Sequence, residues 1–552
     1  MVLATWLASS PRLAHRTGVR TAFPMYVDLA DVIGDGMASP AASHTQPPTR
    51  DSSGSLTDRP ELSALSGRLR TGIAWKAASQ LTGQVARTVM TVILAHLLSP
   101  SDFGLAGMVL LFTGAIQLLA DVGFSASLVQ LPTLTEEDCS TAFWTGLGIA
   151  IALFGVAVVV APSVAGFYHE PRLRWMFVAV AAGFLTTALS TTQASLLWRR
   201  MEFRALELRG IFATLVSAGV GIGAAVAGLG TWSLILQASA LSVTSMVAIW
   251  ILSPWHPRLV FETASLRRMA SFSSNVLFSR FLDYGDRNAD NLLVGRFLGT
   301  TALGIYSIGY SVILIPFGRL VDPIRNVMIP ALAALQEDVA GMRLMWLRGL
   351  RSVASIVFPA LAGVIVVCPD FVSVVLGHRW APATRVIQIL AWVALIQCVS
   401  FLSVAVYTSR NRSGLLLRLT ALAFALDLCS FIVGLHWGVR GVASAYAITN
   451  TLVIIPLNLV MVTRLLECRS KTVALELRGV VEATLMMAAL VFAGRSLLEL
   501  EGIGPAPRLA ISVAIGIAVY ALVCRWREPR TFDFRLRPLE PPDEALGTEA
   551  EA

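Results

Sequence analysis

Long apolar stretches recur along the chain between Thr71 and Trp526, and only short polar segments separate them. Each stretch has about twenty residues, the length with which an α-helix crosses the hydrocarbon core of a bilayer. No intervening segment is long enough to form a soluble domain. The pattern therefore predicts an all-α polytopic membrane protein with about 14 transmembrane helices. We expect these helices at residues 71–97, 103–122, 141–166, 173–196, 210–228, 232–253, 270–298, 302–324, 352–376, 384–408, 413–433, 439–463, 473–497 and 507–525.

Two short matches indicate an internal duplication. Gly104 aligns with Gly304, 200 positions later, and each lies at the tight turn expected between two helices. A second match places Gly230 on Gly438. With six helices in each half, both halves have the same orientation in the membrane. An axis along the membrane normal would then relate them, and a site is expected between them.

The two ends of the chain differ from the rest. We expect no cleaved signal peptide at residues 1–20, since no basic start is followed there by an apolar core. Residues 38–67 are rich in Ser, Pro, Thr and Asp, which favours disorder, and translation could begin at Met37. The Pro-rich tail 527–552 is also expected to be disordered.

Composition supports a membrane location and offers no sign of catalysis. Hydrophobic residues make up 55% of the chain and charged residues 14%, against about 25% charged residues in soluble domains. The net charge of +8 does not indicate a nucleic-acid partner, because the basic residues are spread over many short loops. The six cysteines show no metal-ligand spacing, and HExxH, GxSxG and P-loop motifs are absent. The sequence thus predicts no enzyme, no cofactor and no metal site.

Basic residues also predict the topology. The loops after helices 4, 6, 8, 10 and 12 hold most of them, and the loops on the opposite side hold few. Because loops rich in arginine and lysine stay in the cytoplasm, both termini are predicted to be cytoplasmic. The segment 325–351 carries Arg343, Arg348 and Arg351 among apolar residues, which predicts an amphipathic helix on the inner surface.

A stripe about 100° wide on the predicted helix 270–298 carries charged and amide side chains. Its members are Arg280, Asp283, Arg287, Asp290 and Asn291. A lipid-facing charge near the bilayer centre costs roughly 2.5–3.5 kcal/mol, so the stripe must face protein or water. Asp283 and Asp290 are spaced to pair with Arg287. They are equally candidates to bind a coupling proton or cation, because a carboxylate in a partly dry cleft has a raised affinity for either.

The first predicted helix has a similar polar face. It consists of Lys76, Gln80, Gln84, Arg87 and Thr91. The repeat aligns Arg87 with Arg287, so the two are expected at similar depth and facing one another across a wet cleft. Two guanidinium groups there suit a diphosphate, which they bind in bidentate fashion. The candidate substrate-binding residues are therefore Lys76, Gln80, Gln84, Arg87, Arg280, Arg287 and Asn291. The alternative is that these charges form salt bridges that only hold the helices together.

Four passages of the chain resemble bacterial polysaccharide exporters and O-antigen (lipopolysaccharide) flippases of the multidrug/oligosaccharidyl-lipid/polysaccharide (MOP) superfamily. They are residues 127–144, 195–208, 287–310 and 323–338. The passage RNADNLLVGRFLGTTALGIYSIGY at 287–310 is the most specific. The resemblance extends over about residues 71–525, and the family has no universal motif from which site residues could be transferred.

The resemblance implies two pseudo-symmetric six-helix lobes around a central cavity, plus two C-terminal helices. The expected units are an N-terminal extension 1–70, an N-lobe 71–265, a C-lobe 266–466, helices 13 and 14 within 467–526, and a tail 527–552. It also implies a monomer in the bacterial inner membrane, beside polysaccharide polymerase and chain-length machinery. This monomer would move an undecaprenyl-diphosphate-linked oligosaccharide to the outer leaflet by alternating access, driven by an ion gradient or the membrane potential.

Three other readings compete with a flippase. A multidrug extruder of the same superfamily would usually have twelve helices and a cavity without several arginines. A membrane-bound O-antigen polymerase or ligase, which is an enzyme, needs a large external loop that this chain lacks. A structural scaffold would leave the charges within the membrane unexplained.

The topology can be tested directly. A reporter that is active only outside the cell, fused after Arg200, is expected to stay inactive, because the loop 198–209 is predicted to be cytoplasmic. The same reporter fused after Arg172, on the opposite side, should be active. Reversal of these two results would refute the charge-based orientation.

Overall fold

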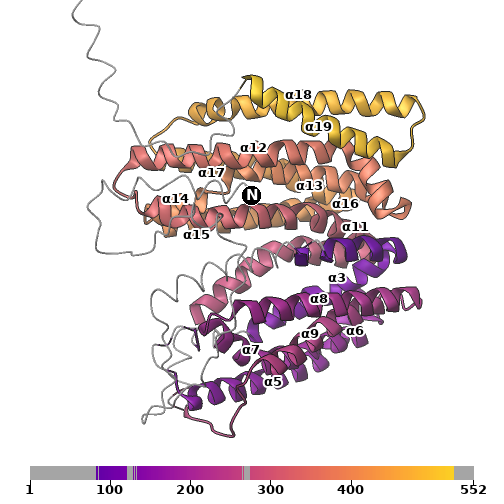
Figure 1. The fold of residues 1–552 in the computed structure, drawn as a ribbon, viewed down its shortest axis with the longest axis vertical. Helices are drawn as coiled ribbons and strands as arrows, with labels where there is room; N and C mark the ends of the chain where they lie inside the picture. Colours follow the sequence, from indigo (N-terminus) through magenta and orange to yellow (C-terminus); the bar gives the residue numbers. More distant parts are fainter. Residues whose placement is uncertain are drawn as a thin grey trace, which may run out of the picture.

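The computed structural model describes residues 82–84, 86–120, 128–129, 131, 134–263, 265 and 274–527. These residues form helices that run side by side as one bundle, and no strand occurs among them (Figure 1). The expectations for residues 1–70 and for the tail after Arg527 lie outside the described residues.

The N-terminal half of the bundle begins with helical residues 86–97, preceded by the helical residues 82–84. The helices that follow are α3 (Pro100–Ala120), α5 (Glu136–Tyr168), α6 (Leu173–Ala181), α7 (Gly183–Arg199), α8 (Phe203–Val226) and α9 (Trp232–Leu252). The start of α5 shows how local chemistry moves a boundary from its predicted position. Thr135 and Asp138 each accept a hydrogen bond from the other's backbone N–H, and this capping box begins the helix earlier than hydrophobicity alone suggests.

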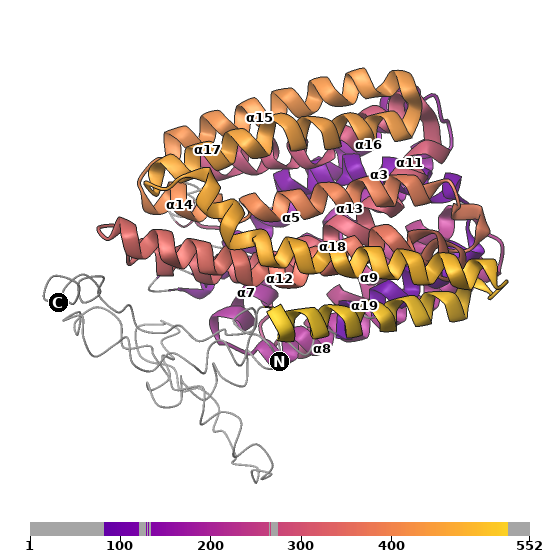
Figure 2. The ribbon, with the colours of Figure 1, turned by 90° about the horizontal axis from the view of Figure 1, so that it is seen from above.

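The C-terminal half contains α11 (Ser274–Ala333), α12 (Val339–Phe371), α13 (Ala383–Gln397), α14 (Ser403–Ser409), α15 (Ser413–Gly434), α16 (Gly438–Thr449) and α17 (Ile455–Leu465). Gly299, with a φ of 83°, interrupts α11 between the two helices that the sequence predicts there. Two π-helical turns, η3 (Val372–Leu376) and η7 (Asn450–Ile454), follow α12 and α16. The hairpin of α18 (Ser470–Leu500) and α19 (Pro505–Arg527) packs on α12, away from the N-terminal half (Figures 1 and 2).

The outer surface of the bundle identifies the chain as a multi-pass membrane protein. Large apolar side chains face outward, among them Val159, Ile251 and Leu485, which are 76%, 78% and 64% exposed. Ten helices of the described residues are long and apolar enough to cross a membrane. One of these spans, Ser413–Leu465, covers two of the predicted helices, and the first predicted helix lies partly outside the described residues. The helical fold is confirmed, and the count of fourteen stays a prediction.

The amphipathic surface helix predicted over 325–351 is wrong. Its first residues continue α11 to Ala333, and α12 begins at Val339, where Asp338 accepts a hydrogen bond from Gly341 N–H at 2.9 Å. Trp346 and Leu350 are fully buried in the core. The apolar residues between the arginines thus belong to the first turns of a long spanning helix. Arg343 donates to the Glu467 carbonyl at 3.2 Å, and Arg351 forms an ion pair with Glu476 at 3.2 Å.

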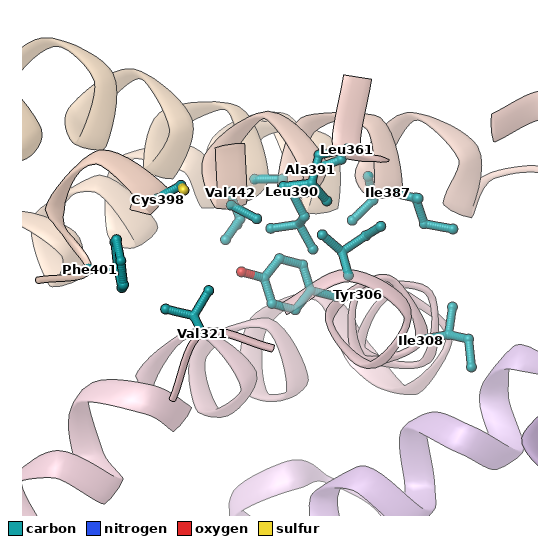
Figure 3. Packing of buried hydrophobic residues seen from close by; sticks show 14 of the residues in the cluster. Tyr306, Ile308, Val321, Leu361, Ile387, Leu390, Ala391, Cys398, Phe401 and Val442 are labelled. Atoms are coloured by element: carbon teal, nitrogen blue, oxygen red, sulfur yellow. The ribbon is translucent and has the colours of Figure 1, made fainter. Parts of the chain in front are cut away.

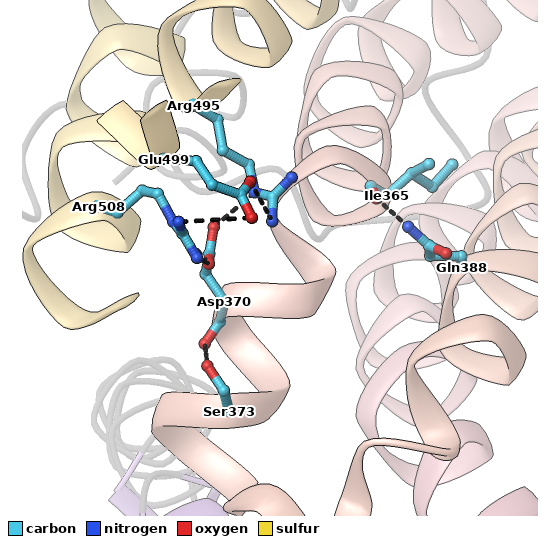
Figure 4. A network of polar contacts seen from close by, with 7 residues as sticks. All are labelled: Ile365, Asp370, Ser373, Gln388, Arg495, Glu499 and Arg508. Carbon is cyan, nitrogen blue, oxygen red and sulfur yellow. Dashed lines mark hydrogen bonds and ion pairs between the residues drawn. The ribbon is translucent and has the colours of Figure 1, made fainter. Parts of the chain in front are cut away.

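An ion cluster fastens the C-terminal hairpin to α12 (Figure 4). Asp370, whose side chain is 1% exposed, accepts hydrogen bonds from Arg495 Nε at 2.6 Å and from Arg508 Nε at 2.8 Å. Glu499 lies 3.6 Å from Arg495 and 3.8 Å from Arg508. One arginine comes from each helix of the hairpin, so a single carboxylate holds both helices. Charged groups can be kept in an apolar setting only when they are paired in this way.

The two halves meet backbone to backbone at the glycines that the internal repeat aligns. A Cβ on Gly104 would collide with the carbonyl oxygen of Thr300, and a Cβ on Gly304 would collide with that of Pro100. Ser101 and Thr300 share a hydrogen bond of 2.9 Å beside this contact. The contact is reciprocal, as expected of a contact on a pseudo-twofold axis.

Gly104→Ala and Gly304→Ala are each expected to destabilise the protein by about 1–3 kcal/mol, since the new methyl group must push two backbones apart. The measurement is the thermal unfolding midpoint of the purified protein. Gly107→Ala is the matched control in the same helix, because its Cβ would meet only the flexible Leu303 side chain at 3.6 Å. Equal midpoints for Gly104→Ala and Gly107→Ala would contradict the close contact.

Candidate functional site

Several of the predicted site residues have side chains that lie outside the described part of the structure. Lys76 and Gln80 lie outside the described residues, and the side chains of Arg280 and Asp283 do as well, although their backbone belongs to α11. Their assignment to a substrate or ion site stays a prediction. The residues that can be placed are Gln84, Arg87, Arg287, Asp290 and Asn291.

Arg87 lies half-buried at the start of helix 86–97. A Cβ on Gly83, one turn earlier, would stand 3.2 Å from a terminal nitrogen of the Arg87 guanidinium, so the side chain folds back over that glycine. Gln84 is on the same turn and its amide nitrogen is 3.4 Å from the Thr88 hydroxyl. The Oε1 of Gln84 is buried without a hydrogen-bond partner. A polar group buried in this way is available to a ligand that can donate a hydrogen bond.

On α11, Arg287 and Asp290 differ in their surroundings. Arg287 is exposed, whereas Asp290 is 4% exposed and accepts a hydrogen bond from the backbone N–H of Asn291 at 2.7 Å. The Oδ1 of Asn291 is buried without a partner. Asp290 is therefore buried, whereas Arg287, one turn earlier on the same helix, is exposed.

A polar network lies inside the C-terminal half and joins four helical segments. Gln397 donates from Nε2 to the Tyr446 hydroxyl at 2.9 Å and to Asn450 Oδ1 at 3.4 Å. Asn450 in turn donates from Nδ2 to Asp427 Oδ1 at 3.0 Å and to the Tyr446 carbonyl at 3.2 Å. These residues come from α13, α15, α16 and η7. Asn450 begins the π-helical turn η7, and such turns occur frequently at functional sites.

Asp290 extends this network to α11. It interacts electrostatically with Tyr446 and with the fully buried Tyr306, and Tyr446 also interacts with Asp427. Figure 3 shows the Tyr306 ring packed among apolar side chains that include Leu390 and Val442. The buried carboxylate of Asp290 and this polar network thus lie in the same C-terminal half of the bundle.

The sequence reading missed most of this network. Asp427 was the available signal, because it is a lone acidic residue within the apolar stretch 413–433. Gln397, Tyr446 and Asn450 give no comparable signal, since single amides and tyrosines are common in membrane helices. No group of three His, Cys, Asp or Glu side chains that could hold a metal ion occurs in the part of the chain that the structure describes.

Comparison with known proteins gives the chain its relatives. The family model described as "Polysaccharide biosynthesis protein" matches residues 93–385, which is more than half of the chain. The chain is similar to the teichuronic acid biosynthesis protein TuaB of Bacillus subtilis (strain 168), with 25% identity over 64% of this chain and 73% of the relative. It is also similar to the lipopolysaccharide biosynthesis protein WzxC of Escherichia coli (strain K12), with 24% identity over 59% of this chain and 67% of the relative.

Solved structures share the fold at low identity. A structure titled "Lipid II flippase MurJ, inward closed conformation" covers 82% of this chain and 98% of its own, with a TM-score of 0.64 and 12% identity. An inward-facing multidrug resistance transporter of the MATE family, of the MOP superfamily, covers 69% of this chain and 95% of its own, with a TM-score of 0.51 and 14% identity. At these identities the match shows a common fold and no common substrate.

Proposed function

Because the chain belongs to the polysaccharide biosynthesis protein family and has the fold of the MOP superfamily, we propose that it is a flippase for a lipid-linked polysaccharide precursor. The substrate is an undecaprenyl-diphosphate-linked oligosaccharide, and the protein moves it from the inner to the outer leaflet of the bacterial inner membrane. The family match over residues 93–385 is the observation that carries this proposal. The relatives named for teichuronic acid and lipopolysaccharide biosynthesis support the same class of substrate.

Alternating access between inward- and outward-open states is the proposed mechanism. The two halves touch through bare backbone at Gly104 and Gly304, and Trp380 adds a second contact at that end by donating from Nε1 to the Ala95 carbonyl at 2.8 Å. Contacts of this kind close one end of the bundle and can separate without breaking a helix. Both termini are proposed to be cytoplasmic, which makes the glycine end the outer end.

A proton or a small cation that binds at Asp290 is the proposed energy source. The support is the burial of Asp290, which is 4% exposed, because a carboxylate taken out of water has a raised affinity for a proton or cation. Asp283 remains a second candidate from the sequence.

The diphosphate of the substrate is proposed to bind Arg87 and Arg287, which the repeat aligns. A diphosphate needs matching donors before it leaves water, whereas the polyprenyl tail can stay in the lipid. Multidrug extrusion, which the shared fold also allows, would not need two guanidinium groups, and the family match does not favour it. A polymerase or ligase, the alternative from the enzyme class, would require a different family.

Replacing Arg87 or Arg287 with Lys retains the charge but removes the planar fork, so we expect at least a tenfold loss of surface polysaccharide, with normal insertion. Replacement with Ala should be at least as damaging. The measurement is surface polysaccharide in a strain that depends on this gene, beside the membrane level of the protein. Arg296, which stacks on the rings of Phe167 and Phe297, is a control arginine on the same helix. Normal export by both alanine variants would show that the two arginines are structural.

Asp290→Asn keeps the shape of the side chain but removes the charge that would bind a proton or cation. We expect transport in vesicles to lose its dependence on the ion gradient while the protein stays folded. The measurement compares glycolipid movement with and without an imposed gradient, together with the unfolding midpoint. The opposite result is a lower unfolding midpoint for Asp290→Asn together with transport that still depends on the gradient once lipid has stabilised the variant. That result would favour a purely structural role for Asp290.

A further inference from the structure

The N-terminal half contains a cavity that the proposed diphosphate site and ion network do not use. It has a volume of about 530 Å³ and lies between α7, α8 and α9, which is within the range of about 300–1,000 Å³ typical of small-molecule sites. Its wall includes six hydroxyl side chains and one arginine, Arg209. The hydroxyl side chains are those of Thr187, Ser190, Thr191, Ser195, Ser242 and Ser245. We call it the hydroxyl cavity.

The position of the cavity in the membrane follows from its helices. It lies near the end of α7, which finishes at Arg199, and near the start of α8 at Phe203. The turn that joins these two helices is in the loop predicted to be cytoplasmic. A surface rich in hydroxyl groups with an arginine is unfavourable toward lipid tails, so the cavity suits a polar ligand that arrives from the inner side.

The hydrogen bonds of the wall decide which ligand chemistry fits. The α7 hydroxyls donate their protons to carbonyls of the preceding turn, as Thr187 does to Gly183 at 2.9 Å and Thr191 to Thr187 at 2.8 Å. Ser195 and Ser242 do the same toward Thr191 and Ala238. Their oxygens therefore offer lone pairs, and the ligand must bring donors of its own. A sugar carries several O–H donors, whereas an ionised phosphate has only acceptors.

Arg209 supplies the complementary donor. It lines the cavity, and a guanidinium group carries only donors, which can hydrogen-bond to the oxygens of a sugar. Trp198, 46% exposed, adds an aromatic surface to the wall, against which the C–H face of a sugar ring can pack.

We propose that the hydroxyl cavity binds a sugar unit of the glycan and so contributes to substrate selection at the inner side of the N-terminal half. This inference rests on the proposed flippase function. Helices α7, α8 and α9 would then contact the glycan, which varies between substrates, while the diphosphate binds elsewhere.

Thr187→Val and Arg209→Gln are the test variants, each with a matched control. Thr186→Val loses the same kind of hydrogen bond to the Gly183 carbonyl, but Thr186 does not line the cavity. Arg204→Gln removes an arginine from the same end of α8. The probe is the soluble oligosaccharide repeat released from the surface polysaccharide of the producing strain, and the readout is its Kd for the purified protein. We expect about a three- to tenfold weaker Kd for each cavity variant and no change for the controls.

Three results would overturn the proposal. The first is equal affinity in cavity and control variants. The second is competition for the cavity by inorganic phosphate or by phosphatidylglycerol vesicles without binding of the oligosaccharide, which would make it a site for an anionic headgroup. The third is a general loss of folding in Arg209→Gln combined with wild-type affinity in Thr187→Val and in Ser242→Ala, which serves as a second cavity variant.

Export in cells separates this inference from the proposed function. If the wild-type chain does not restore surface polysaccharide to a strain that lacks the gene, the flippase function itself is refuted. If the wild type and all cavity variants restore it equally for the native glycan, the function stands and the sugar subsite is refuted.

Discussion

The backbone contact between Gly104 and Gly304 is the constraint on which the arrangement of the two halves depends. Only glycine lets α3 and α11 approach so closely, because a Cβ at either position would occupy the space of a carbonyl oxygen in the other half. Around this contact the halves also share the hydrogen bond from Tyr284 to the Leu111 carbonyl, 2.7 Å long, farther along the same two helices. This pair of helices carries most of the contact between the halves. The halves also touch where Trp380 donates to the Ala95 carbonyl and where Arg296 of α11 stacks on Phe167 of α5.

The apolar environment of a membrane explains where the polar groups are found. Within the hydrocarbon region a polar side chain needs a partner inside the protein. Asp370 meets this need with two arginines of the C-terminal hairpin, and Asn450 meets it by bridging Asp427 and Tyr446. In the cluster around Asp370, the carboxylate forms ion pairs with both arginines and so fastens α18 and α19 to α12. The second cluster, around Asn450, is made of hydrogen bonds between amide, hydroxyl and carboxylate groups from several helices of the C-terminal half.

Prediction from the sequence succeeded where one physical requirement dominates, and it failed where several elements must meet. The length of apolar stretches was sufficient to locate the described helices. The repeat aligned Gly104 with Gly304, but it placed them at turns and did not predict that they touch. Periodicity could not tell an amphipathic surface helix from the inner turns of α12, because both alternate arginines with apolar residues. The partners of Asp290 could not be found either, since Tyr306 follows it on the same helix and Tyr446 is more than 150 positions away. Such long-range contacts depend on how the helices pack, and no local sequence pattern encodes that packing.

Helix α11 carries parts of every feature on which the proposed mechanism depends. Arg287 and Asp290 are one turn apart on it, and after the break at Gly299 it presents Tyr306 to the core and Gly304 to the other half. An ion or a substrate can shift an equilibrium between two states only by binding one state more tightly than the other. In the proposed mechanism, a change of charge at Asp290 acts on the segment before Gly299, whereas the Gly304 contact between the halves lies directly after it. Gly299 separates these two segments, and its φ of 83° is a conformation that glycine adopts without a Cβ penalty. The proposed coupling between ion and glycolipid would therefore use one interrupted helix, which carries Arg287, Asp290 and the Gly304 contact between the halves.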